Sequence, residues 1–293
     1  ASLLTLILLI PELLKLTLSF DRKMLREMLI YSLPVLVANI SFIINENIDK
    51  VFLSQLLPPG ISEQEVGIYA ACCKIAVFLS IFITAFRLGA EPFFFSHSKN
   101  ANAGETYARI MNFFVIAVCL IFVLLVANIE LLKYFIKGRD ATEQALYWSG
   151  LKIVPILLFG YVSLGIYINL SIWYKLSDQT RYGLYISGLG AVITIILNLI
   201  YIPQYGYIAS AWISLTAYTS MMVLSYLWGQ KHYPIPYNLK KNLSYMIASV
   251  CIVFVSFEVF DRNLLIGNAL FIIFTLTVFF VEKKEIRSIL GSK

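Results

Sequence analysis

The sequence predicts an all-α, polytopic membrane protein, and three observations point to this fold class. Hydrophobic residues make up 59% of the chain, and charged residues make up 14%, against about 25% in a typical soluble domain. Apolar runs recur along the whole chain, and many reach the roughly 20 residues that a membrane-spanning helix needs. Lys and Arg concentrate in alternate connectors between these runs, which is a signal of membrane topology rather than of nucleic-acid binding.

About nine transmembrane helices are expected from the apolar runs and the residues that interrupt them. The expected spans are residues 2–19, 27–56, 66–95, 106–134, 143–173, 182–202, 207–229, 241–260 and 264–281. Leu-Pro-Pro-Gly at 57–60 ends the second span, and an acidic loop is expected at 61–65. Glu91-Pro92 is expected to break the third span, and Pro-Gln-Tyr-Gly at 203–206 separates the sixth from the seventh. A charged tail is expected from residue 282.

The distribution of basic residues predicts the orientation of these helices. Fourteen Lys and Arg residues lie in the connectors after the odd-numbered spans and in the tail, and four lie in the opposite connectors. The positive-inside rule then places the first set, and the C-terminus, in the cytoplasm. Trp173, Tyr182 and Trp228 flank the same side and are expected to form an interfacial aromatic belt.

The segment from Leu25 to Leu56 is the main basis for predicting function, because polar residues interrupt its apolar run. An ionisable group at the bilayer centre costs about 2.5–3.5 kcal/mol on insertion scales, so such groups face protein or water. Glu46 and Lys50 have the i,i+4 spacing of a helical ion pair, and Asn39 lies seven residues before Glu46 on nearly the same face. With Asp49, these residues predict a polar face on a membrane helix.

Besides Lys50, three cations lie well within predicted spans, whereas Lys15 lies close to the end of its span. Lys74 has two readings of about equal weight, a contact to an anionic head group or a partner for Glu46 or Asp49. Arg87 and Glu91 have i,i+4 spacing, which favours a local ion pair. Lys152 precedes Pro155 and has no acidic neighbour within one turn, so it is the strongest candidate for substrate contact.

Other polar residues do not form a catalytic constellation. His97 and His232 are far apart in the sequence, and no nucleophilic triad, metal motif or phosphate-binding glycine loop is present. We therefore expect no enzyme, no metal and no cofactor. Asn198, like other isolated amides in spans, is expected to hydrogen-bond a neighbouring helix rather than to form a site.

Several motifs, in order, resemble the second lobe of polysaccharide and lipid-linked oligosaccharide flippases. The first three are Tyr-Ser-Leu-Pro at 31–34, Asn-Ile-Asp-Lys at 47–50 and Val-Gly-Ile-Tyr-Ala-Ala at 66–71. Glu-Pro-Phe-Phe at 91–94 follows, and then Asn198 precedes Ile-Pro-Gln-Tyr-Gly at 202–206. These flippases belong to the multidrug/oligosaccharidyl-lipid/polysaccharide exporter superfamily. The family usually has Gly-Ala-Ala where this chain has Ala-Ser-Ala at 209–211.

This resemblance implies a fold and a division of the chain. Residues 1–20 would be the last helix of a mostly absent N-terminal lobe. Residues 21–232 would be a MATE-like second lobe of six helices, and 233–293 two extra transmembrane helices with a cytoplasmic tail. The chain is thus expected to be the C-terminal part of a longer protein in the bacterial inner membrane.

The resemblance also implies a function, which is alternating-access flipping of an undecaprenyl-pyrophosphate-linked oligosaccharide, such as a polysaccharide or O-antigen repeat unit of lipopolysaccharide. The expected partners are this lipid-linked oligosaccharide, membrane lipid, the missing N-terminal lobe and a polysaccharide polymerase, with no nucleic acid. The implied substrate-binding residues are Lys50, Lys74, Arg87, Lys152 and Asn39, with Glu46 and Asp49 for ion coupling or charge balance. Two alternatives stay open: a cation-coupled multidrug exporter of the same superfamily, and a membrane enzyme of cell-envelope polysaccharide assembly.

Overall fold

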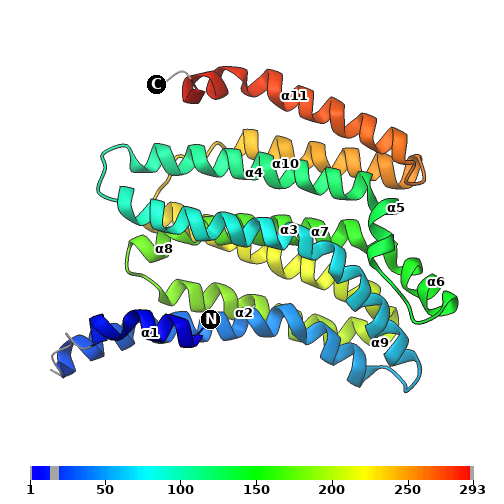
Figure 1. The fold of residues 1–293 in the computed structure, drawn as a ribbon, viewed down its shortest axis with the longest axis horizontal. Helices are drawn as coiled ribbons and strands as arrows, with labels where there is room; N and C mark the ends of the chain where they lie inside the picture. Colours follow the sequence, from blue (N-terminus) through cyan, green and yellow to red (C-terminus); the bar gives the residue numbers. More distant parts are fainter. Residues whose placement is uncertain (1, 14–19, 291–293) are drawn as a thin grey trace.

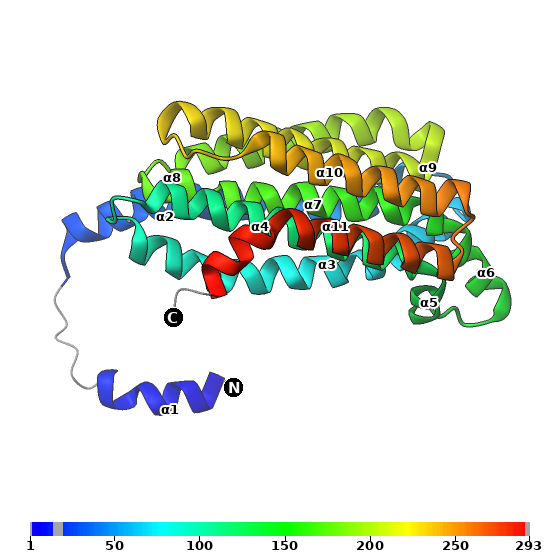
Figure 2. The same cartoon turned by 90° about the horizontal axis from the view of Figure 1, so that it is seen from above.

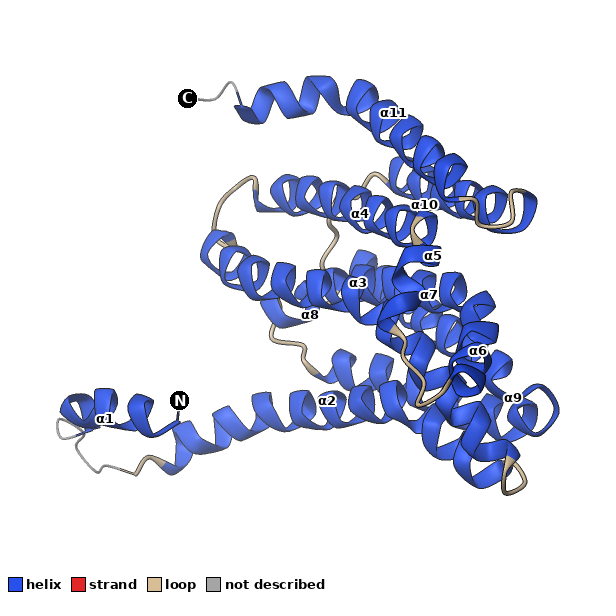
Figure 3. Ribbon diagram, turned by 45° about the vertical axis from the view of Figure 1, so that its right-hand side comes forward, coloured by secondary structure: helices blue, strands red, loops and turns tan. Residues whose placement is uncertain are grey.

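The computed structural model describes residues 2–13 and 20–290, and these form helices joined by short connectors, with no β-strand among them (Figures 1 and 3). The α-helices are α1 (Ser2–Leu13), α2 (Arg22–Leu56), α3 (Ile61–His97), α4 (Ala103–Ala127), α5 (Ile129–Leu132), α6 (Ala141–Ser149), α7 (Val154–Leu170), α8 (Ile172–Leu176), α9 (Arg181–His232), α10 (Leu239–Phe254) and α11 (Leu264–Leu290). Two 3₁₀ turns, η1 (Lys133–Phe135) and η2 (Gly150–Ile153), and a π-helical turn, η3 (Val255–Val259), complete the chain. The expected all-α class is confirmed.

Local signals explain where α2 and α3 begin. The Asp21 carboxylate caps α2 by accepting from the backbone N–H of Lys23 at 2.8 Å and of Met24 at 3.2 Å. The loop expected at 61–65 is wrong, because the backbone N–H groups of Ile61 and Ser62 bond the carbonyl of Pro58 and start α3 there. Because of these bonds, α3 begins immediately after the Pro-Pro-Gly turn.

The break expected at Glu91-Pro92 is also wrong, since α3 continues through Pro92 to His97. A proline removes only one helical donor, and the exposed position of Pro92 leaves room for its ring. The break expected at 203–206 is confirmed, because Gly206 has φ 56° and ψ −138° inside α9. The element named α9 is therefore two helices, and its 52 residues would extend about 78 Å if they were straight.

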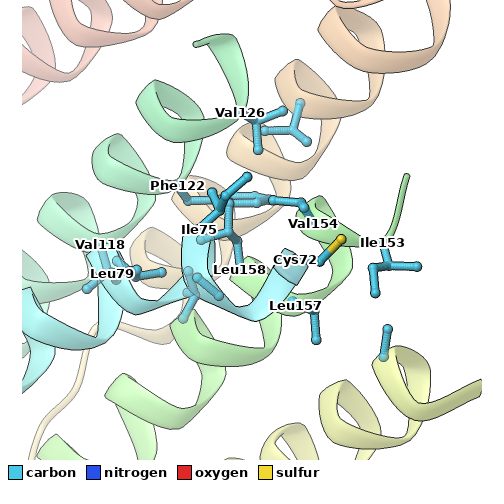
Figure 4. Close-up of a cluster of buried hydrophobic side chains, with 14 of the residues drawn as sticks. Cys72, Ile75, Leu79, Val118, Phe122, Val126, Ile153, Val154, Leu157 and Leu158 are labelled. Carbon is cyan, nitrogen blue, oxygen red and sulfur yellow. The ribbon is translucent and has the colours of Figure 1, made fainter. Parts of the chain in front are cut away.

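The core lies around α7, which packs against α3, α4 and α9 (Figure 2). Buried side chains from α3, α4, η2 and α7 meet in one cluster, which Figure 4 shows. Ile75 and Leu79 of α3 lie there with Phe122 of α4 and Leu158 of α7, and each is 0–1% exposed. A second contact, α2 along α9, places the polar part of α2 against α9.

Helices α10 and α11 pack on α4. The amides of Asn128 and Asn268 donate to each other's oxygens at 3.1 and 3.2 Å, joining α4 to α11. The charged segment from residue 282 begins within α11, which continues to Leu290, and Glu282 is buried. Its carboxylate accepts from Lys241 at 2.7 Å and from Tyr245 at 2.5 Å, so α10 partners neutralise it.

Six candidate membrane spans are found among the residues that the structure describes, by length and apolar composition. The 52-residue α9 counts once among them although Gly206 divides it. The expected count of about nine is not confirmed. The belt expected at Trp173 is also wrong, because Trp173 is only 1% exposed and its indole N–H donates to Ser225 at 3.3 Å.

Candidate functional site

A buried carboxylate on α2 is the centre of the strongest candidate site. Asp49 is 1% exposed, and both of its oxygens accept hydrogen bonds from other helices. Tyr69 of α3 donates at 2.8 Å and Ser214 of α9 at 2.7 Å to one oxygen, and Asn198 of α9 donates at 2.6 Å to the other. We call Asp49, Tyr69, Asn198 and Ser214 the Asp49 cluster.

The donors of this cluster come from both halves of α9. Asn198 precedes the reversal at Gly206 and Ser214 follows it, so the same carboxylate ties the two halves together. One turn before Asp49, the buried Asn45 accepts from Thr194 of the first half of α9. Gly190 lies beside this contact and leaves room for Met221, because a Cβ there would lie 2.4 Å from the Met221 sulfur.

Two buried side-chain oxygens of α9 have no hydrogen-bond partner within the described residues. These are the Asn198 side-chain oxygen and the Ser210 hydroxyl, which lies one turn before Ser214, and both residues are 0% exposed. Carboxylate, amide and hydroxyl oxygens are ligands for hard cations or for a water. The cluster therefore has the chemistry to accept a small cation or a proton.

Glu46 and Lys50 extend the polar region without forming the ion pair that their spacing predicts. Both side chains are half-buried, and the ion pairs of the described residues include neither. Tyr161 of α7 lies close enough to Glu46 for an electrostatic interaction with its carboxylate.

The other predicted cations lie apart from the Asp49 cluster. Lys74 and Arg87 are exposed on α3, and no ion pair to either occurs in the part of the chain that the structure describes. The predicted Arg87–Glu91 pair is wrong, because Glu91 pairs with Lys175 of α8. The prediction that Lys74 pairs with Glu46 or Asp49 is likewise not supported, because hydroxyl and amide groups already donate hydrogen bonds to both oxygens of Asp49.

Lys152 is exposed on η2, and its ammonium lies 5.6 Å from the centre of the Tyr207 ring, in the range of a cation–π contact. The side chain of Asn39 falls outside the described part of the structure. Of the seven predicted site residues, the structure therefore places Glu46, Asp49 and Lys50 in one polar region, and Lys74, Arg87 and Lys152 on exposed surfaces of the helices.

The sequence reasoning missed most partners of Asp49. Asn198 was expected to act only as a helix contact, and neither Tyr69 nor Ser214 was singled out. The sequence does contain one signal for these partners. Asn198 and Ser214 lie on either side of the Pro-Gln-Tyr-Gly break, and a chain reversal at that break lets both residues contact the same neighbouring helix.

Three comparisons with known proteins bear on this site. The MatE family model matches residues 34–200, which include all members of the Asp49 cluster except Ser214. A solved structure, lipid II flippase MurJ in its inward closed conformation, matches with TM-score 0.55 and 19% sequence identity, over 98% of this chain and 61% of that chain. The chain thus spans about three fifths of the length of that flippase, and the likeness establishes the fold alone. The search of curated proteins found no match.

Proposed function

Since the chain belongs to the MatE family, we propose that it is part of a transporter that flips a lipid-linked, anionic oligosaccharide across a membrane by alternating access. One observation carries this proposal. Lys74 and Arg87 on α3 are exposed cations within a membrane-spanning helix, without a carboxylate partner among the described residues. Unpaired cations at that depth are costly unless a watery cavity or an anionic ligand meets them.

The chemistry of the proposed substrate fits these side chains. A pyrophosphate that links a polyprenyl lipid to a sugar carries negative charge, and its attraction to a cation strengthens as the local dielectric falls. Lys152, in η2 just before α7, adds a third cation on another element. In this proposal Lys74, Arg87 and Lys152 meet the head group at successive points of its path, since Lys74 and Arg87 lie about 20 Å apart along α3. Lys50 and Asn39 line the same path, and undecaprenyl pyrophosphate is the carrier.

Coupling is proposed to reside in the Asp49 cluster. A cation or proton bound at Asp49 would change the interaction of α2 with both halves of α9, because the carboxylate contacts each half. A carboxylate that binds the two halves differently in its charged and neutral forms can shift a conformational equilibrium. Glu46, with Asp49, would balance the positive charge of the substrate-binding lysines when no substrate is bound.

The transport proposal predicts a specific loss in Lys74→Gln and Lys152→Gln. Each change keeps most of the side-chain length and removes the charge, so export of lipid-linked oligosaccharide should require about tenfold more substrate for half-maximal rate. Lys137→Gln, on an exposed connector, is the matched control. Export would be measured in cells that depend on this protein, with membrane levels quantified. Normal export by both variants at limiting substrate would remove these lysines from the site.

The orientation proposal predicts opposite labelling of two exposed positions at the two ends of α3. Gln64→Cys near the start of α3 and Asn100→Cys between α3 and α4 would be made after the four native cysteines are replaced. An impermeant thiol reagent added to intact cells should label the first cysteine and not the second. Labelling of Asn100→Cys alone would reverse the proposed topology and place the C-terminus outside.

A cation-coupled multidrug exporter is the second candidate, and the Asp49 cluster is the observation that favours it. A buried acid suits a proton or sodium site, but it recognises no lipid. Substrate choice separates the two candidates: expulsion of cationic dyes that persists in Lys74→Gln, without any export of lipid-linked oligosaccharide, would support the drug exporter.

A further inference from the structure

An ion pair joins α3 to α8 near the end of α3 that the charge pattern places in the cytoplasm. Lys175, in the last turn of α8, pairs with the carboxylate of Glu91, which lies less than two turns before α3 ends at His97. The two side chains are 23% and 36% exposed, so solvent reaches both. A partly exposed ion pair contributes little net stability, because water screens its charges. A stronger anion can therefore replace Glu91 at Lys175 at a small cost.

Arg87 gives this ion pair an excess of positive charge. It precedes Glu91 by one turn of α3, and Arg87, Glu91 and Lys175 line one pocket between α3, α4, α7 and α8. Arg87 takes part in no ion pair among the described residues. Asp178, the next acid along the chain, is exposed on the connector after α8 and does not line this pocket. Two cations and one carboxylate thus share the pocket, which favours an anion.

The pocket has no room for an anion while Glu91 stays paired with Lys175. Its volume is about 10 Å³, which is about the space of one water. Its other walls are largely apolar and include the rings of Phe86, Phe94 and Phe114. An anion must therefore take the place of the Glu91 carboxylate. Beside these apolar walls its attraction to the two cations is stronger than in open water.

A diphosphate has the chemistry to displace a carboxylate from these two cations. It carries more negative charge than Glu91, and it offers several oxygens at once. The planar guanidinium of Arg87 can bond two phosphate oxygens together, whereas the ammonium of Lys175 acts as a point charge beside them. The exchange replaces one charged contact at Lys175 by charged contacts at both Lys175 and Arg87.

We propose that Lys175 is a further substrate-binding residue, and that Glu91 competes with the substrate for it; this rests on the proposed function. In the empty state Glu91 neutralises Lys175. The diphosphate of the incoming lipid then binds Lys175 and Arg87, and the Glu91 carboxylate is released to water. The substrate itself thereby breaks the ion pair between α3 and α8, and the cytoplasmic ends of these helices are no longer tied by it.

Calorimetric titration of the purified whole transporter with inorganic pyrophosphate and with farnesyl diphosphate tests this proposal. Glu91→Gln keeps the shape of the side chain and removes the competing charge, so both probes should bind about tenfold more tightly. Lys175→Gln should weaken the binding of both probes about tenfold. Lys175→Arg keeps the charge and should stay within about threefold of the unchanged protein. An ion pair with a purely structural role predicts weaker binding in Glu91→Gln as well.

Glu130→Gln is the matched control, because Glu130 pairs with Lys133 outside this pocket, and it should leave the binding of both probes unchanged. Weaker or equal binding by Glu91→Gln, or unchanged binding by Lys175→Gln, would overturn the proposal. The transport proposal is tested separately. Tighter pyrophosphate binding by Glu91→Gln, without any flipping of lipid-linked oligosaccharide by the unchanged transporter, would uphold the competition at Lys175 and refute the transport proposal.

Discussion

Asp49→Asn is expected to reduce transport at least tenfold while leaving the helices folded. The amide nearly matches the carboxylate in shape, and its N–H₂ can donate to the Tyr69 and Ser214 oxygens while its oxygen still accepts from Asn198. The charge that couples a cation or proton to α9 is lost. Transport would be measured with the whole transporter in proteoliposomes, with and without an ion gradient.

Two further variants separate charge from packing. Asp49→Ala removes the acceptor as well, so the three donors lose a buried partner, and the free energy of unfolding should fall by about 2–4 kcal/mol in detergent. Glu63→Gln, the same chemical change at an exposed position of α3, is the matched control and should alter neither quantity. Gradient-dependent transport by Asp49→Asn at the normal rate would exclude Asp49 from coupling.

The helices were largely predictable from sequence because apolar runs of membrane length report directly on burial in lipid or protein. Each expected span from 27–56 onward overlaps one or more described helices, and the spans 182–202 and 207–229 are the two halves of α9. The errors at 61–65 and at Pro92 have one cause. Turn and proline residues show where a helix can end. They do not show whether a nearby carbonyl accepts the first helical hydrogen bonds, or whether there is open space for a proline ring, and either of these lets the helix extend past the signal.

The site was predictable only in part, because the partners of its residues are distant in the sequence. The polar face of α2 follows from its spacing, and it led to Glu46 and Asp49. Their partners are distant: Asn198 is 149 positions from Asp49, and Ser214 is 165 positions away. The i,i+4 rule also predicts an Arg87–Glu91 ion pair. In the structure Glu91 pairs instead with Lys175, which is 84 positions away in the sequence.

The Asp49 cluster depends on the reversal of α9, and Gly206 is the residue at which α9 reverses. Gly206 has φ 56° and ψ −138°, a region that other residues adopt at a cost of about 1–3 kcal/mol. A Cβ there would lie 2.2 Å from a carboxylate oxygen of Glu65. That oxygen accepts from the backbone N–H of Tyr207 at 2.7 Å, and so caps the second half of α9 from α3.

Gly206→Ala is therefore expected to lower the free energy of unfolding by about 2–5 kcal/mol, combining backbone strain with a displaced cap. Two glycines separate these causes. Gly60→Ala has a positive φ of 88° but open space, so it should show strain alone. Gly188→Ala, helical and uncrowded in the same α9, should be neutral or stabilising by up to about 1 kcal/mol.

Removing the crowding carboxylate completes the set. Glu65→Ala should lose only the cap, about 0.5–2 kcal/mol, and the double variant with Gly206→Ala should be less destabilised than the sum of the two single changes, because the Cβ then meets no carboxylate. Chemical denaturation in detergent, followed by circular dichroism, gives all five values. If Gly206→Ala unfolds at the same denaturant concentration as Gly188→Ala, then Glu65 and the reversal do not hold the two halves of α9 in the geometry that Asp49 requires.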